Sequence, residues 1–284
     1  MGSAVTSRSA GAASTACGEV RRGLAVGVLE ALRERAISCC VMRNAGGLPR
    51  ELQSRDLDLI VSSTYPAALD AALREGAGAA GGRLWLHRRG LGFRQALLVA
   101  PAPGGYVFLG VDLHEDACCY GVPYLAGQRL ISASRRVAAA VAVAHPVHQA
   151  LTAWLGPLLA AGISRPRYHG LVGEVARAHR SALGEEMDRI VGRAAAAWLI
   201  AQIAAERFDR LEARARRLRR AFFTRALARV PAATLTGLGR FGLDFARTLL
   251  RPGALQLRVG MSSEAAARPG SQAPRAEGGT GEIG

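Results

Sequence analysis

Two aspartates stand one residue apart in the segment SRDLDLIVSS, residues 54–63. Alternate residues of a β-strand share a face, so Asp56 and Asp58 should project together, with Leu57 and Val61 turned to the core. Two adjacent carboxylates repel, and each raises the pKa of the other unless a cation lies between them. A hard divalent ion such as Mg²⁺, which prefers oxygen ligands, is the usual cation. The pattern indicates a metal site; acids that only face water are the alternative.

A third acid lies in the segment VFLGVDLHED, residues 107–116. On a strand, Asp112 shares its face with Tyr106, Phe108 and Gly110. A third carboxylate from a neighbouring strand would complete a cluster able to hold one or two metal ions for in-line phosphoryl transfer. His114 falls on the same face, where it is either a partner of that cluster or a side chain facing solvent.

Hydrophobic periodicity predicts the elements that must position these acids. The expected strands are 37–43, 56–61, 83–88, 93–100 and 106–114. The expected helices are 19–36, 66–75, 146–161, 168–179, 187–205, 206–229 and 235–250. This order predicts an α/β (α+β) fold, a mixed sheet flanked by helices and followed by an all-helical domain. We expect four parts: a disordered segment 1–18, a sheet domain 19–140, a helical domain 141–250, and a degenerate strand with a disordered tail, 251–284.

The charge of the chain is strongly positive. Its 284 residues carry a formal net charge of +15, and every basic side chain other than histidine is an arginine. The codon bias of a GC-rich genome explains such a composition, yet the field attracts phosphates, nucleic acid or anionic lipid in either case.

The cysteines and the apolar runs indicate a cytoplasmic protein. Five cysteines, including the pairs Cys39–Cys40 and Cys118–Cys119, show no C-x-x-C spacing, so we expect reduced thiols, with one of each pair directed inward. No run approaches the roughly 20 apolar residues of a membrane span.

The segment Glu206–Arg229 is rich in arginine and has an apolar stripe from Phe208 to Leu227. It is a core helix with a solvated face, a helix lying on an anionic membrane surface, or a contact for a phosphate backbone. Nucleic acid is the least favoured partner, because no binding module and no aromatic interleaving accompany the arginines. Lipid binding would make the protein peripheral to the membrane. Arg165 and Arg167 in SRPRYHG are expected near a helix start, with the cleft between the two domains as the alternative.

The order helix, strand, Gly-containing loop, D-x-D strand, helix and Asp strand resembles the nucleotidyltransferase fold of the DNA polymerase beta superfamily. The segment VMRNAGGLPRELQSRDLDLIV, residues 41–61, resembles one branch of it, as do GVDLHEDACCYGVPYL, WLGPLLAAGISRPRYHGLV and LLRPGALQLRVG further along. In that branch a thymidylate kinase-like domain often follows, and some members lie among genes for surface polysaccharide. The resemblance covers residues 20–260.

The resemblance implies transfer of a nucleotidyl group from a nucleoside triphosphate to an unknown acceptor, with one or two Mg²⁺ ions. It matches the metal-binding and catalytic acids to Asp56, Asp58 and Asp112. It places four residues close to the triphosphate: Arg43, Asn44, Gly46 and Gly47.

The sequence departs from the family pattern in two places. The Gly-Ser pair that precedes the D-x-D motif in active members is replaced by the loop NAGGLPRELQS, and no P-loop sequence follows Gly260, so we expect no P-loop kinase. Three hypotheses therefore stand: an active nucleotidyltransferase, a catalytically inactive nucleotide- or partner-binding remnant, and an Arg-rich protein associated with membrane or nucleic acid.

Overall fold

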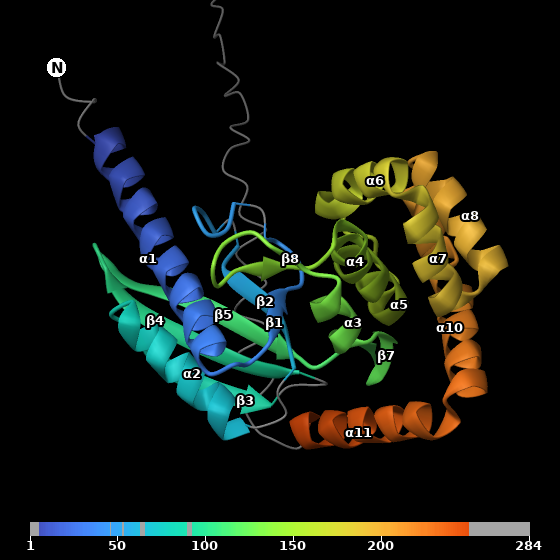
Figure 1. The fold of residues 1–284 in the computed structure, drawn as a ribbon. Helices are drawn as coiled ribbons and strands as arrows, with labels where there is room; N and C mark the ends of the chain where they lie inside the picture. The colour runs from blue at the N-terminus through green and yellow to red at the C-terminus, as the bar shows by residue number, and fades with distance from the viewer. Residues whose placement is uncertain (1–5, 46, 53, 63–65, 90–92, 250–284) are drawn as a thin grey trace, which may run out of the picture. The chain divides into compact units, whose positions relative to one another are not determined.

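The computed structural model describes residues 6–249 except 46, 53, 63–65 and 90–92 (Figure 1). Its centre is a mixed seven-stranded sheet, in which β2 runs parallel to β5 and β1 parallel to β9, and the other neighbours are antiparallel. In spatial order the strands are β3 (Arg83–Arg89), β4 (Arg94–Ala102), β5 (Gly105–His114), β2 (Asp56–Val61), β1 (Cys39–Val41), β9 (Ala142–Val143) and β8 (Arg135–Arg136).

Two helices, α1 (Thr6–Glu34) and α2 (Pro66–Ala79), pack side by side on one face of the sheet (Figure 1). They approach closely because glycines meet where they cross: a Cβ atom on Gly27 would collide with the backbone of Gly76. The buried side chains of this layer, such as Leu24, Val28 and Leu73, form one hydrophobic cluster with the apolar face of β2, β4 and β5.

A second hydrophobic cluster joins the sheet to the helical half of the protein. Cys40, Met42 and Ile60 extend from the sheet into it, and the fully buried Trp154 lies within it. In the described part of the chain, the remaining elements are β6 (Ala117–Cys119), β7 (Val122–Leu125), α3 (Gly127–Ser132), α4 (Pro146–Ala150), the π-helical turn η1 (Leu151–Leu155), α5 (Gly156–Ala161), the 3₁₀ turn η2 (Pro166–Tyr168), α6 (His169–Ala178), α7 (Arg180–Val191), α8 (Arg193–Ala204), α9 (Phe208–Ala213), α10 (Ala215–Arg229) and α11 (Pro231–Leu249). Residues up to Asp244 form one compact unit.

The expected fold class is confirmed: a mixed sheet with helices precedes an all-helical region, α6 to α11. The first helix was placed too late. It begins at Thr6, and the described residues 6–18 of the expected disordered segment belong to it. That stretch contains no proline and is rich in alanine, the strongest helix former, so the helix extends in the N-terminal direction. The degenerate strand and disordered tail expected at 251–284 lie outside the described residues.

Two long helices predicted in the second half are each divided. The expected helix 187–205 is α7 and α8, which meet at Gly192 with its φ of 91°, a conformation that glycine adopts without strain. The expected helix 206–229 is α9 and α10, which meet at Arg214. Apolar periodicity continues through both breaks, so the sequence pattern did not reveal them.

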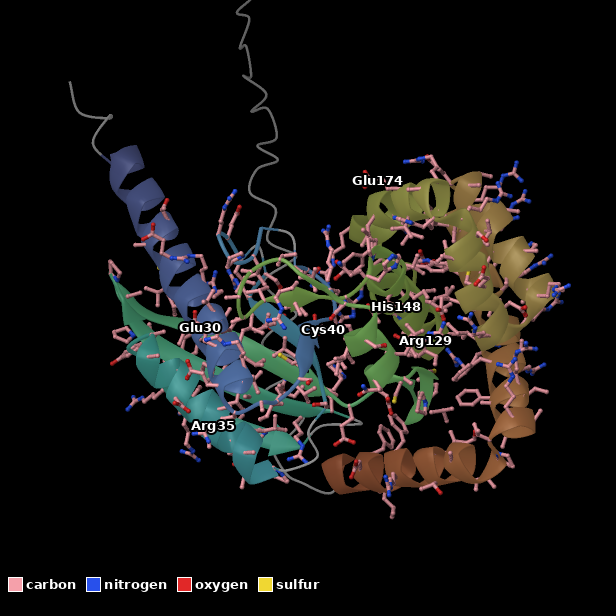
Figure 2. All side chains as sticks on the ribbon, viewed as in Figure 1. Glu30, Arg35, Cys40, Arg129, His148 and Glu174 are labelled. Atoms are coloured by element: carbon pink, nitrogen blue, oxygen red, sulfur yellow. The ribbon has the colours of Figure 1, made fainter. Side chains whose placement is uncertain are left out.

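The cysteines lie as the alternation of strand residues predicts. Cys40, labelled in Figure 2, and Cys119 are buried, whereas Cys39 and Cys118 are half-buried, and all five thiols are free. Burial raises the pKa of the Cys40 thiol to about 12, so it stays protonated at neutral pH.

The contact between α1 and α2 gives a direct test of the fold. Gly76→Ala should lower the free energy of unfolding by about 1–3 kcal/mol, because its new methyl group would overlap the backbone of Gly27 and Val28. Gly78→Ala, in the same helix but with open space around it, should raise that free energy by about 0.5–1 kcal/mol. Urea unfolding followed by circular dichroism measures both, and equal effects of the two variants would contradict the packing described here.

Candidate functional site

The register between β2 and β5 brings the predicted acids together. Asp58 pairs directly with Asp112, and Asp56 pairs with Gly110. Because the strands are parallel and side chains alternate, all three carboxylates lie on one face of the sheet. Gly110 makes room for the first of them: a Cβ atom there would lie 2.6 Å from Oδ1 of Asp56.

The three acids have different surroundings. Asp58 is buried, with 3 % of its surface exposed, whereas Asp56 at the start of β2 is exposed. Asp112 is half-buried, and its Oδ1 accepts a hydrogen bond of 3.0 Å from Nε2 of Gln95 on β4. Asp56 and Asp58 therefore share a face without sharing an environment.

A histidine joins the two inner acids. Ligand atoms of Asp58, Asp112 and His114 all lie within 4.8 Å of one another, and this is the one such group of three or more potential metal ligands in the described part of the chain. Nε2 of His114 is buried and has no hydrogen-bond partner among the described residues, while its ring stacks on Phe93 at 5.1 Å. Two carboxylates and an unpaired imidazole nitrogen are a donor set that could hold a divalent cation.

Arg43 supplies a positive charge to the buried acid. It follows β1, and its Nε and Nη2 donate hydrogen bonds of 2.8 Å to Oδ2 and Oδ1 of Asp58. Its Nη1 donates to the carbonyl oxygen of Thr152 at 3.4 Å. Burial alone would raise the pKa of Asp58, but the hydrogen bonds and the charge of Arg43 outweigh that effect, and this pKa lies below its usual range.

The pKa values of Asp112 and His114 are shifted in opposite directions. Burial, and then the charge of Asp58, raise the pKa of Asp112 to about 6 against the hydrogen bond from Gln95. Burial lowers the pKa of His114 to about 4, so the imidazole is neutral at pH 7. A neutral imidazole can bind a cation through its free nitrogen. A cation beside Asp112 would in turn favour the ionised carboxylate and lower its raised pKa.

The residues expected near the triphosphate, which begin at Arg43, contact different parts of the protein. Arg43 reaches the acids, whereas Oδ1 of Asn44 accepts a hydrogen bond of 3.2 Å from the hydroxyl of Tyr168. Gly47 is exposed and forms a turn, in which its carbonyl oxygen accepts the amides of Arg50 and Glu51 at 2.8 Å. Gly46 lies outside the described residues.

Arginines from both halves of the protein act on the acids. Burial, and then the charge of Asp58, raise the pKa of Asp56, while Arg43, Arg167 and Arg55 oppose the rise. Arg167, in η2, also lowers the pKa of Asp58. Sequence reasoning favoured a place at a helix start for this arginine, and its effect on the acids could not be read from local sequence.

A cavity of about 360 Å³ adjoins the acids. Arg43 and His114 line it from the sheet side, and Thr152 and Arg165 line it from the helical side, together with Tyr124. The cavity places basic side chains next to the acidic group, which suits a ligand that combines an anion with a bound cation.

The Arg-rich segment has its apolar side inside the protein. Phe208, Leu211, Leu218 and Phe222 are buried in the second hydrophobic cluster, whereas Leu227 is exposed. None of the helices among the described residues has the length and the apolar character needed to span a membrane. A membrane contact through this segment would therefore rest on its arginines alone.

A second ionic cluster is centred on the carboxylate of Glu186. Arg129 and His148, labelled in Figure 2, both contact the carboxylate of Glu186, and Nη1 of Arg189 lies 2.8 Å from it. Burial would raise the pKa of Glu186, but the hydrogen bonds and charges around it hold that pKa below its usual range. This cluster has a structural explanation within α3, α4 and α7.

The pair between Arg43 and Asp58 should dominate the stability of the site. Arg43→Met should lower the free energy of unfolding by about 3–5 kcal/mol in the presence of a chelator, because it leaves a buried carboxylate without a partner. The matched control is Arg35→Met, which removes a pair with Glu75 whose side chains are 40 % and 49 % exposed and should cost about 0–1 kcal/mol. Urea unfolding measures both, and similar losses would contradict a buried pair.

The raised pKa of Asp112 predicts a dependence of stability on pH. An aspartate has a pKa of about 3.9 in an unfolded chain. Since the folded pKa is about 6, the folded protein binds the proton more tightly, and this contribution to stability is lost as the pH rises through about 6. With a chelator present, Asp112→Asn should therefore have a higher melting temperature than the unsubstituted protein at pH 8, and the difference should vanish near pH 4. A lower melting temperature at pH 8 would contradict the shift.

No protein-family model, curated protein or solved structure matches this chain. The likeness to nucleotidyltransferases therefore stays a prediction from sequence, and the geometry of the acids carries the functional argument.

Proposed function

We propose that this protein is a nucleotidyltransferase, which moves a nucleotidyl group from a nucleoside triphosphate to a hydroxyl or phosphate oxygen of an acceptor and releases pyrophosphate. One observation carries the proposal: Asp58 and Asp112 lie side by side on parallel strands, with Asp56 on the same face. Three carboxylates on one sheet face, beside a cavity that Arg43 and Arg165 line, suit a substrate that arrives as a complex of a triphosphate and a metal ion.

The inner acids would hold the cation, and Mg²⁺ is the proposed ion because oxygen donors predominate. Asp58 and Asp112 would be its ligands, and the exposed Asp56 on the same face would offer a further oxygen donor. His114 adds a nitrogen donor, which also suits Mn²⁺ or Zn²⁺. A bound divalent ion supplies Lewis-acid stabilisation of the charge that develops on the transferred phosphoryl group.

The other residues have separate roles in this proposal. Arg43 and Arg167 attract the triphosphate and stabilise its negative charge, as they stabilise the ionised forms of Asp56 and Asp58. One of the carboxylates would accept the proton of an acceptor hydroxyl.

A second candidate is an inactive nucleotide-binding protein derived from such an enzyme. The two hydrogen bonds from Arg43 to both carboxylate oxygens of Asp58 favour it, because Asp58 must share or release this partner before it can bind a cation. The exposed arginines of Glu206–Arg229 support a third, weaker candidate, attraction to an anionic membrane surface.

Thermal melts with ligands test the cation and nucleotide parts together. A nucleoside triphosphate with Mg²⁺ or Mn²⁺ at 100 times its dissociation constant should stabilise the fold by about 2.7 kcal/mol and raise the melting temperature accordingly. Asp58→Asn should abolish the rise, whereas Asp209→Asn, which changes an exposed acid on α9, should keep it. No rise with any of the four triphosphates would remove the proposal.

Transfer of label from an α-³²P triphosphate separates the two leading candidates. Incorporation of label into an acceptor that requires Asp112 supports the transferase. Stabilisation by the triphosphate without incorporation supports the inactive nucleotide-binding protein.

A further inference from the structure

Three large aromatic side chains are exposed together on the sheet. Trp85 on β3 and Tyr106 on β5 are each 65 % exposed, and Phe108 on β5 is 46 % exposed. The ring centroids of Trp85 and Phe108 are 6.1 Å apart with 50° between the ring planes. With Arg83 and Val99 these rings line a hollow of about 260 Å³. We call Trp85, Tyr106 and Phe108 the aromatic platform.

The platform shares a sheet face with the acids. Along β5, Tyr106, Phe108 and Asp112 alternate with the buried residues 107, 109, 111 and 113. The last three of these buried residues belong to the hydrophobic cluster beneath α1 and α2. Phe108 and Asp112 are four residues apart, which is about 13 Å along a strand. A ligand lying on the platform can therefore extend along β5 to the acids without leaving this face.

The platform requires an explanation because helices α1 and α2 cover the opposite face of the same strands. Single exposed apolar residues are ordinary, but a group of three aromatic rings around a hollow is typical of an interaction site. The charged member of the hollow is Arg83, which selects for an anionic partner.

We propose that the aromatic platform binds unpaired bases of a single-stranded nucleic acid, and that this strand is the acceptor which reaches the acids. Bases of any sequence stack on exposed aromatic rings, and arginine contributes both cation–π contact and attraction to phosphate. The net charge of +15 favours a polyanion over a neutral saccharide. It also opposes association of two copies through this face, because each copy carries the same large charge.

The platform could not be predicted from the sequence, because its residues are dispersed along the chain. Trp85 is separated by about twenty residues from Tyr106 and Phe108, and only the order β3, β4, β5 brings them together. The acceptor role rests on the proposed function, whereas binding to the platform does not, so the two parts are tested separately.

Tryptophan fluorescence reports on the platform directly. Of the other tryptophans, Trp154 is buried and Trp198 is covered by the guanidinium of Arg214 at 4.6 Å, so Trp85 is the exposed reporter. A single-stranded 12-nucleotide RNA or DNA, added with a chelator at low salt, should quench this fluorescence to saturation, and its affinity should fall as salt rises. Trp85→Phe should remove the quenching while a labelled strand still binds.

Affinity measured by fluorescence anisotropy of a labelled strand separates stacking from general attraction. Trp85→Ala and Phe108→Ala should each weaken binding about tenfold, the effect of losing one stacked base. Leu235→Ala, an exposed apolar residue on α11 with 61 % exposure, is the matched control and should not change the affinity. The measurement uses a chelator and no triphosphate, so a failed nucleotidyltransferase proposal leaves it intact.

Three results would overturn the binding proposal. The first is equal affinity of the strand for the unsubstituted protein and for both alanine variants. The second is quenching by a neutral oligosaccharide but not by the strand. The third is a dimer in solution that Trp85→Ala converts to a monomer. Binding at the platform without label transfer to the strand, in a protein that labels another acceptor, would overturn the acceptor role.

Discussion

Two carboxylates side by side on neighbouring strands need positive charge nearby, and this requirement organises the site. The parallel register of β2 and β5 places Asp58 against Asp112, and Arg43 donates two hydrogen bonds to the carboxylate of Asp58. Asp112 keeps a raised pKa, and Nε2 of His114, a residue of the same group, is buried without a hydrogen-bond partner among the described residues. The protein's own groups therefore neutralise the charge of the acids only in part, which supports the proposed cation.

The residues of the site come from both halves of the protein, the sheet that packs in the first hydrophobic cluster and the helical half that packs in the second. The acids stand on sheet strands whose other face packs under α1 and α2, so their spacing is set by a rigid layer. The arginines come from loops and turns around the sheet, and Arg167 belongs to the helical half. A contact between Asn44 and Tyr168 crosses between the same two parts. Rigid acids and basic groups drawn from two layers are a suitable arrangement for a ligand that enters between them.

Much of the fold could be predicted because alternation is a strong local signal. In DLDLIV the apolar residues mark one face of β2, and the same alternation in VFLGVDLH placed Asp112 on the face of the other acids. The bidentate pair of Arg43 with Asp58 could not be predicted, because it depends on how the chain leaves β1. The part played by His114 required the register between two strands. The break at Gly192 was missed because apolar periodicity continues across it, while the backbone conformation there does not.

The π-helical turn η1 has a consequence for the control of charge at the acids. Thr152 lies in this turn, where its hydroxyl contacts the carbonyl oxygen of Met42 at 3.3 Å and its own carbonyl accepts from Arg43. Wide turns of this kind depart from regular α-helical bonding and are frequent at functional sites. A movement of α4 and α5 would be transmitted through Thr152 to the guanidinium and would change how firmly Arg43 holds Asp58. The position of the positive charge beside Asp58 therefore depends on both halves of the protein, because the guanidinium of Arg43 contacts a sheet carboxylate and a carbonyl oxygen of η1.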